Sequence, residues 1–172
     1  MSWEDNDIYT CQSCGCEDLV LPRGPKNSPV LLIGEFPGET ELKTGKPFTG
    51  RAGTVLRSEL RYLDIDINQI RKTTLWQHAQ NKDEKCLSLS EQAVLEEAKN
   101  KEMIILVGSD TVKHFTEFNV MSVTGLQVKS AHFSAPIIMA CVNPAIVYHR
   151  GGVGEFRLSI QKIAKRIKEV IF

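Results

Sequence analysis

The sequence predicts an α/β protein, a three-layer α/β/α sandwich with a mostly parallel central sheet. Short apolar runs recur along the chain, partly β-branched and bounded by Gly, Ser or Pro, as in buried parallel strands. Segments with helix composition separate these runs. Such alternation places helices on both faces of one sheet, with a ligand crevice beyond the carboxyl ends of the strands.

Three apolar runs predict strands at residues 30–33, 103–107 and 137–141. A weaker run at 73–76 lies between two charged segments and predicts a fourth strand. Cys141 falls inside the third clear run, so we expect it in the core.

Helices are predicted at 52–62 and 89–100 and over the last segment of the chain. Ser88, followed three residues later by Glu91, forms a capping box for the second helix. The last helix is the clearest, because its apolar residues recur at spacings of four, three and four. These residues are Phe156, Ile160, Ile163 and Ile167.

Composition indicates one domain over residues 1–172, with an irregular Cys-, Gly- and Pro-rich lobe at about 1–29. Twenty-one basic residues balance 21 acidic ones, so overall charge does not select a partner. No run is long enough for a membrane span. The start, MSWEDNDIYT, lacks a secretory pattern, so we expect an intracellular, cytoplasmic protein of prokaryotic or phage type, without structural disulfides.

The stretch LLIGEFPGETELKTGKPFTGRAG, residues 31–53, carries five glycines and two prolines behind the first predicted strand. Gly34 and Gly38 let backbone amides approach a ligand closely. Glycines that only turn the chain are the alternative, but that reading does not account for Phe48. We expect Phe48, pinned after Pro47, to lie outside the core and to stack on a planar ring.

Residues 34–53 resemble the first motif of the family 4 uracil-DNA glycosylases, the iron–sulfur branch of the uracil-DNA glycosylase superfamily. VNPAIVYHRGG, at 142–152, occupies the place of the family's second motif, and LVGSD, at 106–110, resembles the strand end between them. The resemblance extends from Cys11 to the last helix. It implies a uracil-DNA glycosylase-like fold.

The resemblance also implies roles for particular residues. Glu35 would position the attacking water, and Phe48 would stack on the base, with Gly34, Phe36 and Gly38 around it. Asn143 stands where the family usually has histidine and keeps a neutral donor for a carbonyl oxygen.

Thr74 stands where the family has asparagine to read the uracil edge, so base discrimination is in question. Gln77 is an alternative source of that amide if the strand register shifts.

Three further residues are expected to contact DNA. Ser109 and Arg150 would contact phosphates, and His149 would either insert into the vacated base position or remain an exposed loop residue. His114 and His132 carry no motif.

Cys11 and Cys14 form a C-x-x-C pair where the family supplies two thiolates of a four-iron cluster. The resemblance implies His78 and Cys86 as the remaining ligands, with Cys16 as a substitute for His78. The expected cofactor is a 4Fe-4S cluster, and zinc fits the same ligands. Free thiols without a metal are the remaining alternative.

These features favour a DNA glycosylase that removes uracil, or a related deaminated or modified base, and leaves an abasic site. The alternative is a weakened or inactive DNA-binding or replication-accessory protein that keeps the fold. A nucleotide-binding enzyme is disfavoured because no P-loop or G-x-G-x-x-G is present. We expect a monomer that binds DNA and no membrane, with replication or repair proteins as candidate partners.

Overall fold

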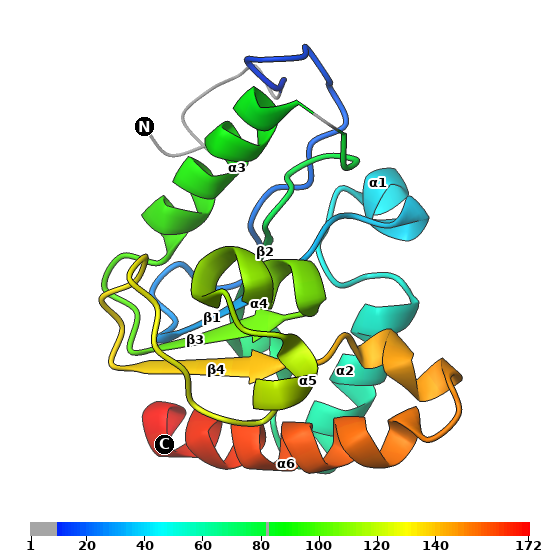
Figure 1. The fold of residues 1–172 in the computed structure, drawn as a ribbon, viewed down its shortest axis with the longest axis vertical. Coiled ribbons are helices and arrows are strands. Elements are labelled where there is room, and N and C mark those ends of the chain that lie inside the picture. The colour runs from blue at the N-terminus through cyan, green and yellow to red at the C-terminus, as the bar shows by residue number, and fades with distance from the viewer. Residues whose placement is uncertain (1–9, 82) are drawn as a thin grey trace.

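A computed structural model describes residues 10–81 and 83–172, so the first nine residues of the predicted N-terminal lobe lie outside it. Four strands in the described chain form one sheet in the order β2-β1-β3-β4 (Figure 1). They are β1 (Val30–Gly34), β2 (Arg71–Thr74), β3 (Met103–Val107) and β4 (Ile137–Cys141). All three pairings are parallel, so the carboxyl ends meet at one edge.

Helices cover both faces of this sheet, which confirms the predicted α/β/α sandwich. Figure 1 shows α2 (Arg51–Tyr62) and α6 (Gly152–Ile171) on one side, and α3 (Glu84–Glu97) and α4 (Ser109–Thr116) on the other. Shorter elements complete the fold: α1 (Glu39–Thr44), α5 (Val120–Val123), and the 3-10 turns η2 (Ile67–Gln69) and η3 (Pro144–Tyr148).

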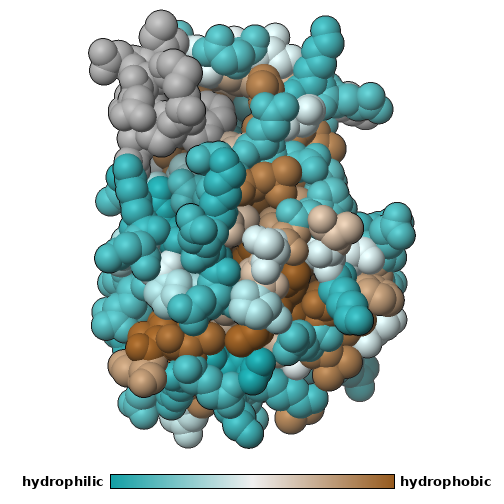
Figure 2. Space-filling view, turned by 90° about the vertical axis from the view of Figure 1, so that its left-hand side faces the viewer, coloured by the Kyte–Doolittle hydropathy of each residue, from teal (hydrophilic) through white to brown (hydrophobic). Residues whose placement is uncertain are grey.

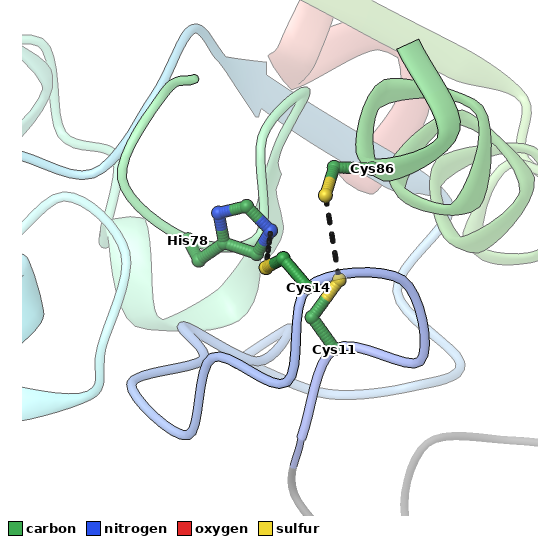
Figure 3. Close-up of side chains that lie close together, drawn as sticks. All are labelled: Cys11, Cys14, His78 and Cys86. Carbon is green, nitrogen blue, oxygen red and sulfur yellow. Dashed lines mark hydrogen bonds between the residues drawn. The ribbon is translucent and has the colours of Figure 1, made fainter. Parts of the chain in front are cut away.

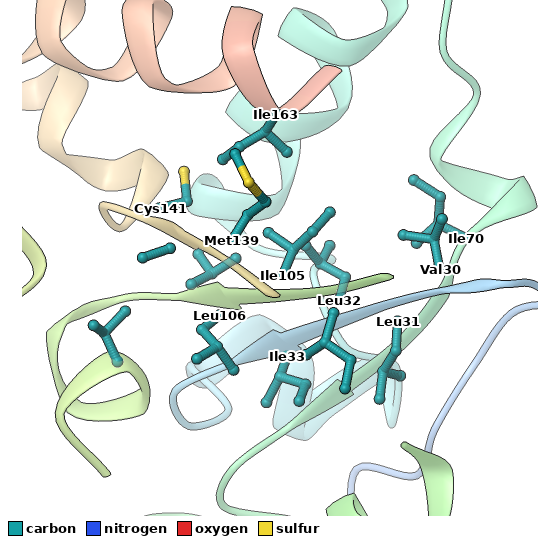
Figure 4. Close-up of a cluster of buried hydrophobic side chains, with 14 of the residues drawn as sticks. Val30, Leu31, Leu32, Ile33, Ile70, Ile105, Leu106, Met139, Cys141 and Ile163 are labelled. Carbon is teal, nitrogen blue, oxygen red and sulfur yellow. The ribbon is translucent and has the colours of Figure 1, made fainter. Parts of the chain in front are cut away.

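The core lies between the sheet and these helices. Ile105 of β3 pairs with Met139 of β4, and Met139 points toward Ile163 of α6, whereas Leu106 lies on the opposite side of the strands (Figure 4). These side chains are almost wholly buried. Cys141 is buried as well, which confirms its predicted place in the core.

The first and the last two apolar runs form strands as predicted, but β2 begins two residues earlier than the predicted 73–76 and ends at Thr74. Its first two residues are charged and yet buried. Arg71 forms an ion pair with Glu97 (2.8 Å), and Lys72 Nζ donates to the carbonyl oxygen of Ile70 (2.9 Å). These partners offset the cost of burial, and an apolar pattern therefore missed the start of the strand.

The predicted capping box of the second helix is wrong. Helix α3 begins at Glu84, because the side chain of Asp83 accepts a hydrogen bond from the backbone N–H of Lys85. Ser88 therefore lies inside the helix, which ends at Glu97 instead of residue 100.

Residues 10–29 contain no helix and are tied to the sheet by backbone bonds. Arg23 forms an isolated bridge with Lys72, and the N–H of Val20 donates to the carbonyl oxygen of Gln77 (2.6 Å).

The face at the amino ends of the strands, shown in Figure 2, is mainly hydrophilic, with apolar residues in smaller groups. No described helix has the length and hydrophobicity to cross a bilayer.

Candidate active site and metal centre

A cavity of about 80 Å³ lies at the carboxyl edge of the sheet. Each strand contributes to it through its last residue or the loop that follows, because parallel strands end at the same edge. The lining residues include Gly34, Glu35, Thr74, Val107 and Asn143, together with Phe36, Glu41, Phe48, Ala52, Gly53 and Pro144.

Glu35 is held in this cavity by two donors from distant parts of the chain. Its Oε1 accepts from Asn143 Nδ2 (3.1 Å), and its Oε2 accepts from the backbone N–H of Asp110 (3.2 Å) at the start of α4. Gly108 makes room for this carboxylate. Its φ is +97°, and a Cβ there would lie 1.9 Å from Glu35 Oε1.

Burial raises the pKa of Glu35 above its usual value, and the hydrogen bonds from Asn143 and Asp110 offset only part of this effect. The carboxylate is thereby made more basic while its orientation is fixed. A carboxylate of this kind can accept a proton from a water molecule in the cavity.

Phe48 also lines the cavity, with its ring against the backbone of Gly34. A Cβ on Gly34 would lie 2.9 Å from Phe48 Cζ, so glycine is needed there. Phe48 is 7% exposed and packs with the core, so the expectation that it lies outside the core is wrong. Its φ of 57° is uncommon for a bulky residue, and Arg57 Nη2 donates to its carbonyl oxygen (3.3 Å). The ring is both a core residue and part of the cavity wall.

Thr74 lines the cavity, but its hydroxyl donates to the carbonyl oxygen of Trp76 (2.6 Å). Gln77, the alternative source of an amide, is 1% exposed and does not line the cavity. Its Nε2 donates to the carbonyl oxygen of Thr74 (2.6 Å) and to Thr73 Oγ1 (3.2 Å). Neither residue presents a side-chain amide to the cavity.

The glycine-rich loop is closed by Glu41, which the sequence analysis did not single out. Its carboxylate accepts from the backbone N–H groups of Gly38 (3.1 Å) and Gly50 (2.9 Å). Gly38 therefore lies near the cavity without lining it, whereas Phe36 lines the rim and is 46% exposed. A Glu three residues after a helix cap was the available sequence signal.

The three residues predicted to contact DNA are all exposed, and none lines the cavity. Ser109 is the first residue of α4, and His149 and Arg150 follow η3. Tyr148, which precedes His149, belongs to a pair that no sequence motif indicated: the guanidinium of Arg51 lies 4.0 Å from the centre of the Tyr148 ring. Tyr148 is 53% exposed.

A second group of functional side chains joins the N-terminal segment to the loop before α3 and to the first turn of that helix. Cys11, Cys14, His78 and Cys86 place their ligand atoms within 4.8 Å of one another (Figure 3). The Sγ atoms of Cys11 and Cys86 are 3.7 Å apart, and Cys14 Sγ lies 3.6 Å from His78 Nε2. These are the four residues that the resemblance implied, and the group could hold a metal. Cys16 is not part of it.

The surroundings of these side chains support ligation. The Nδ1 atom of His78 is 2.8 Å from the carbonyl oxygen of Ala79, which leaves Nε2 facing the cysteines. Burial raises the pKa of Cys11, but hydrogen bonds from the backbone N–H groups of Cys14 and Ser13 and from the side chains of His78 and Cys14 together outweigh it and bring this pKa to about 7. Burial raises the pKa of Cys86 to about 11, so its ionisation needs a nearby positive charge such as a metal ion.

The fold and the site define an α/β protein whose ligand crevice lies beyond the carboxyl ends of parallel strands, with Glu35 and Phe48 in its wall. Residues 21–163 match the uracil DNA glycosylase superfamily, and the chain belongs to this superfamily. It is also similar to the type-4 uracil-DNA glycosylase of Thermotoga maritima, with 38% identity over 58 residues. This stretch is 31% of the chain and spans only 30% of that relative's length.

Proposed function

We propose that the protein is a DNA glycosylase that hydrolyses the N-glycosidic bond of uracil, or of a related deaminated or modified base, and leaves an abasic site. The observation that carries this proposal is the placement of Glu35, a carboxylate of raised pKa, in a cavity walled by Phe48. Membership of the superfamily and the similarity to a type-4 uracil-DNA glycosylase support it.

In this proposal the target base leaves the DNA stack and enters the cavity, where it packs against Phe48. Glu35 orients a water and takes its proton as the water oxygen bonds to the sugar carbon. The bond between sugar and base breaks, and its electron pair leaves with the base. The sugar gains the hydroxyl, the departing base gains a proton from solvent, and Glu35 returns the proton it took to solvent.

Asn143 has two roles in this proposal. One hydrogen of its Nδ2 is engaged with Glu35, and its Oδ1 accepts from the backbone N–H of Ala145 (2.9 Å). An amide nitrogen carries two hydrogens, so the second is free to stabilise negative charge on a base oxygen. Asn143 would thus hold Glu35 in place and contact the departing base.

The metal centre has a structural role in this proposal. It lies outside the cavity and connects the irregular segment around Cys11 to helix α3 through Cys86. The resemblance to the iron–sulfur branch implies a 4Fe-4S cluster, and zinc is the alternative for the same four ligands.

The second candidate function is that of a DNA-binding or replication-accessory protein whose catalysis is weakened or absent. It is favoured by Thr74, whose hydroxyl is bonded within the protein, and by Gln77, whose amide nitrogen is bonded within the protein and whose side chain does not line the cavity. Recognition of the base edge would then rest on backbone groups and Asn143 alone, which reduces discrimination among bases.

DNA is the partner that both candidate functions require. Ser109, His149 and Arg150 are exposed beyond the strand ends. Ser109 and Arg150 would contact phosphates, and His149 would either insert into the vacated base position or remain an exposed loop residue. Protein partners and the monomeric state remain predictions.

Incubation with oligonucleotides that contain uracil, followed by alkaline cleavage at abasic sites, tests the proposal. We expect cleavage at the uracil position and none in the matched thymine oligonucleotide. Hypoxanthine, xanthine and deaminated-base mismatches extend the substrate set. If none is excised while DNA binding persists, the second candidate function replaces the first.

A further inference from the structure

We propose that Cys11, Cys14, His78 and Cys86 hold a single tetrahedral zinc ion instead of a four-iron cluster. The inference concerns the metal centre alone and does not depend on catalysis. It rests on the spacing of the ligand atoms, on the kinds of atoms they are, and on the contacts behind them.

Two pairs of ligand atoms have the spacing expected around one ion. With zinc–sulfur bonds of ~2.3 Å, two sulfurs on a tetrahedral ion lie ~3.8 Å apart, and a sulfur and an imidazole nitrogen lie ~3.6 Å apart. The corresponding distances here are 3.7 Å between Cys11 and Cys86, and 3.6 Å between Cys14 and His78. The agreement covers one pair of each kind, and all four ligand atoms lie within 4.8 Å of one another.

A four-iron cluster requires wider spacing. Each of its protein ligands binds a different iron, and the ligands point outward from the corners of a cube of irons and sulfides. All four ligand atoms here lie within 4.8 Å of one another, which leaves room between them for an ion but not for that cube. Fitting a cluster would require the segment around Cys11 to move away from helix α3.

The donor set gives a second, independent reason. Three cysteines and one histidine form a recognised structural zinc site, whereas four-iron clusters are held by cysteine thiolates. The one other nearby cysteine among the described residues, Cys16, lies outside the group. The chain therefore presents a nitrogen where a cluster would take a fourth sulfur.

The hydrogen bonds to the ligand side chains also suit zinc. The Nδ1 atom of His78 lies 2.8 Å from the carbonyl oxygen of Ala79, an arrangement that orients a zinc-bound imidazole. Asn81 Nδ2 donates to Cys86 Sγ (3.6 Å), which stabilises a thiolate at that position. Zinc in this place would tie residues 11–14 to the first turn of α3.

Metal analysis of the full chain tests the inference. The protein is purified without oxygen from cells supplied with both iron and zinc, and metal and acid-labile sulfide are measured per chain. We expect about one zinc, less than about a tenth as much iron, no sulfide, and no visible absorption band. A brown protein with iron and sulfide would overturn the inference, as would one iron per chain or no metal at all.

Two cysteine variants test the ligand set. Cys14 is exposed, so Cys14→Ser should leave the fold intact and lower bound zinc by about tenfold or more. Cys16→Ser is the matched control, two residues away and outside the group, and should retain the zinc. The reverse pattern would refute this ligand set.

Cobalt(II) binding to the metal-free protein adds a spectroscopic test. We expect the intense visible bands of a tetrahedral ion with thiolate ligands in the wild type and in Cys16→Ser, and their loss in Cys14→Ser. The pale spectrum of an octahedral ion in the wild type would contradict the proposed geometry. Neither measurement uses base excision, so an inactive protein that binds zinc would separate this inference from the proposed function.

Discussion

Replacing Glu35 by glutamine tests the proposed chemistry with little change in shape. The carboxylate accepts hydrogen bonds from Asn143 and from the backbone of Asp110, whereas an amide has one accepting oxygen. We expect excision to slow by about 10²–10⁴-fold, the usual contribution of a positioned general base. This range corresponds to about 3–5 kcal/mol of barrier. Affinity for DNA should change little, because the side chain keeps its volume.

The pH dependence gives this prediction a second readout. Burial raises the pKa of Glu35, so the carboxylate keeps its proton to a higher pH than an ordinary glutamate. Activity in the wild type should fall as the pH drops through this raised pKa, and should be retained above it. The Glu35→Gln variant has no group to titrate there, so this inflection should disappear from its profile.

The assay is single-turnover excision with protein in excess over a uracil oligonucleotide, alongside a binding measurement at each pH. Glu39→Gln is the matched control, because Glu39 is a highly exposed carboxylate at the start of α1 that forms a surface ion pair with Lys43 and does not line the cavity. It should keep the wild-type rate and profile. If Glu35→Gln matches the wild type in both, Glu35 is not the base and the proposed mechanism is refuted.

Four further variants, at three positions, probe the cavity and the packing beside it. Phe48→Ala should lower the free energy of unfolding by about 3–5 kcal/mol in urea titrations, because the residue is only 7% exposed. Phe48→Leu should retain much of that stability but weaken binding of the base by about 1–3 kcal/mol. If Phe48→Leu binds the base as tightly as the wild type, the ring does not stack on it. Gly108→Ala should abolish excision, because the added Cβ would displace the side chain of Glu35. Circular dichroism should show that the variant remains folded. Full activity would refute the inference that Gly108 makes room for Glu35. Thr74→Asn should raise the rate of uracil excision up to about tenfold, because this is the usual contribution of one added hydrogen bond. No gain in rate would favour the non-catalytic function.

Much of the fold could be predicted because short-range patterns report burial directly. The runs at 103–107 and 137–141 are apolar along their whole length and form β3 and β4 at those bounds. β2 was predicted poorly because Arg71 and Lys72 are buried with polar partners, and the partner of Arg71 lies 26 residues away. The start of α3 was missed because Asp83, not Ser88, bonds the first turn.

The chemistry of individual site residues was less predictable than their identity. Glu35, Asn143 and Thr74 do line one cavity, yet the sequence does not show that the hydroxyl of Thr74 is already bonded to Trp76. Glu41, which closes the glycine-rich loop through Gly38 and Gly50, was also missed. Its contact with Gly50 spans nine residues and depends on the path of the loop.

The order of residues in the chain determined the alternation of strands and helices, the glycines behind the first strand, and the C-x-x-C pair of Cys11 and Cys14. These follow from local periodicity, backbone freedom and a short spacing of ligands, whereas His78 and Cys86 were implied by the family resemblance. Tertiary structure decided that Asn143, 108 residues from Glu35, donates to its carboxylate, and that Phe48 is both core and cavity wall. It also decided how closely the four ligands approach one another. Such properties depend on where distant segments meet when the sheet and its helices pack, and no local pattern encodes those distances.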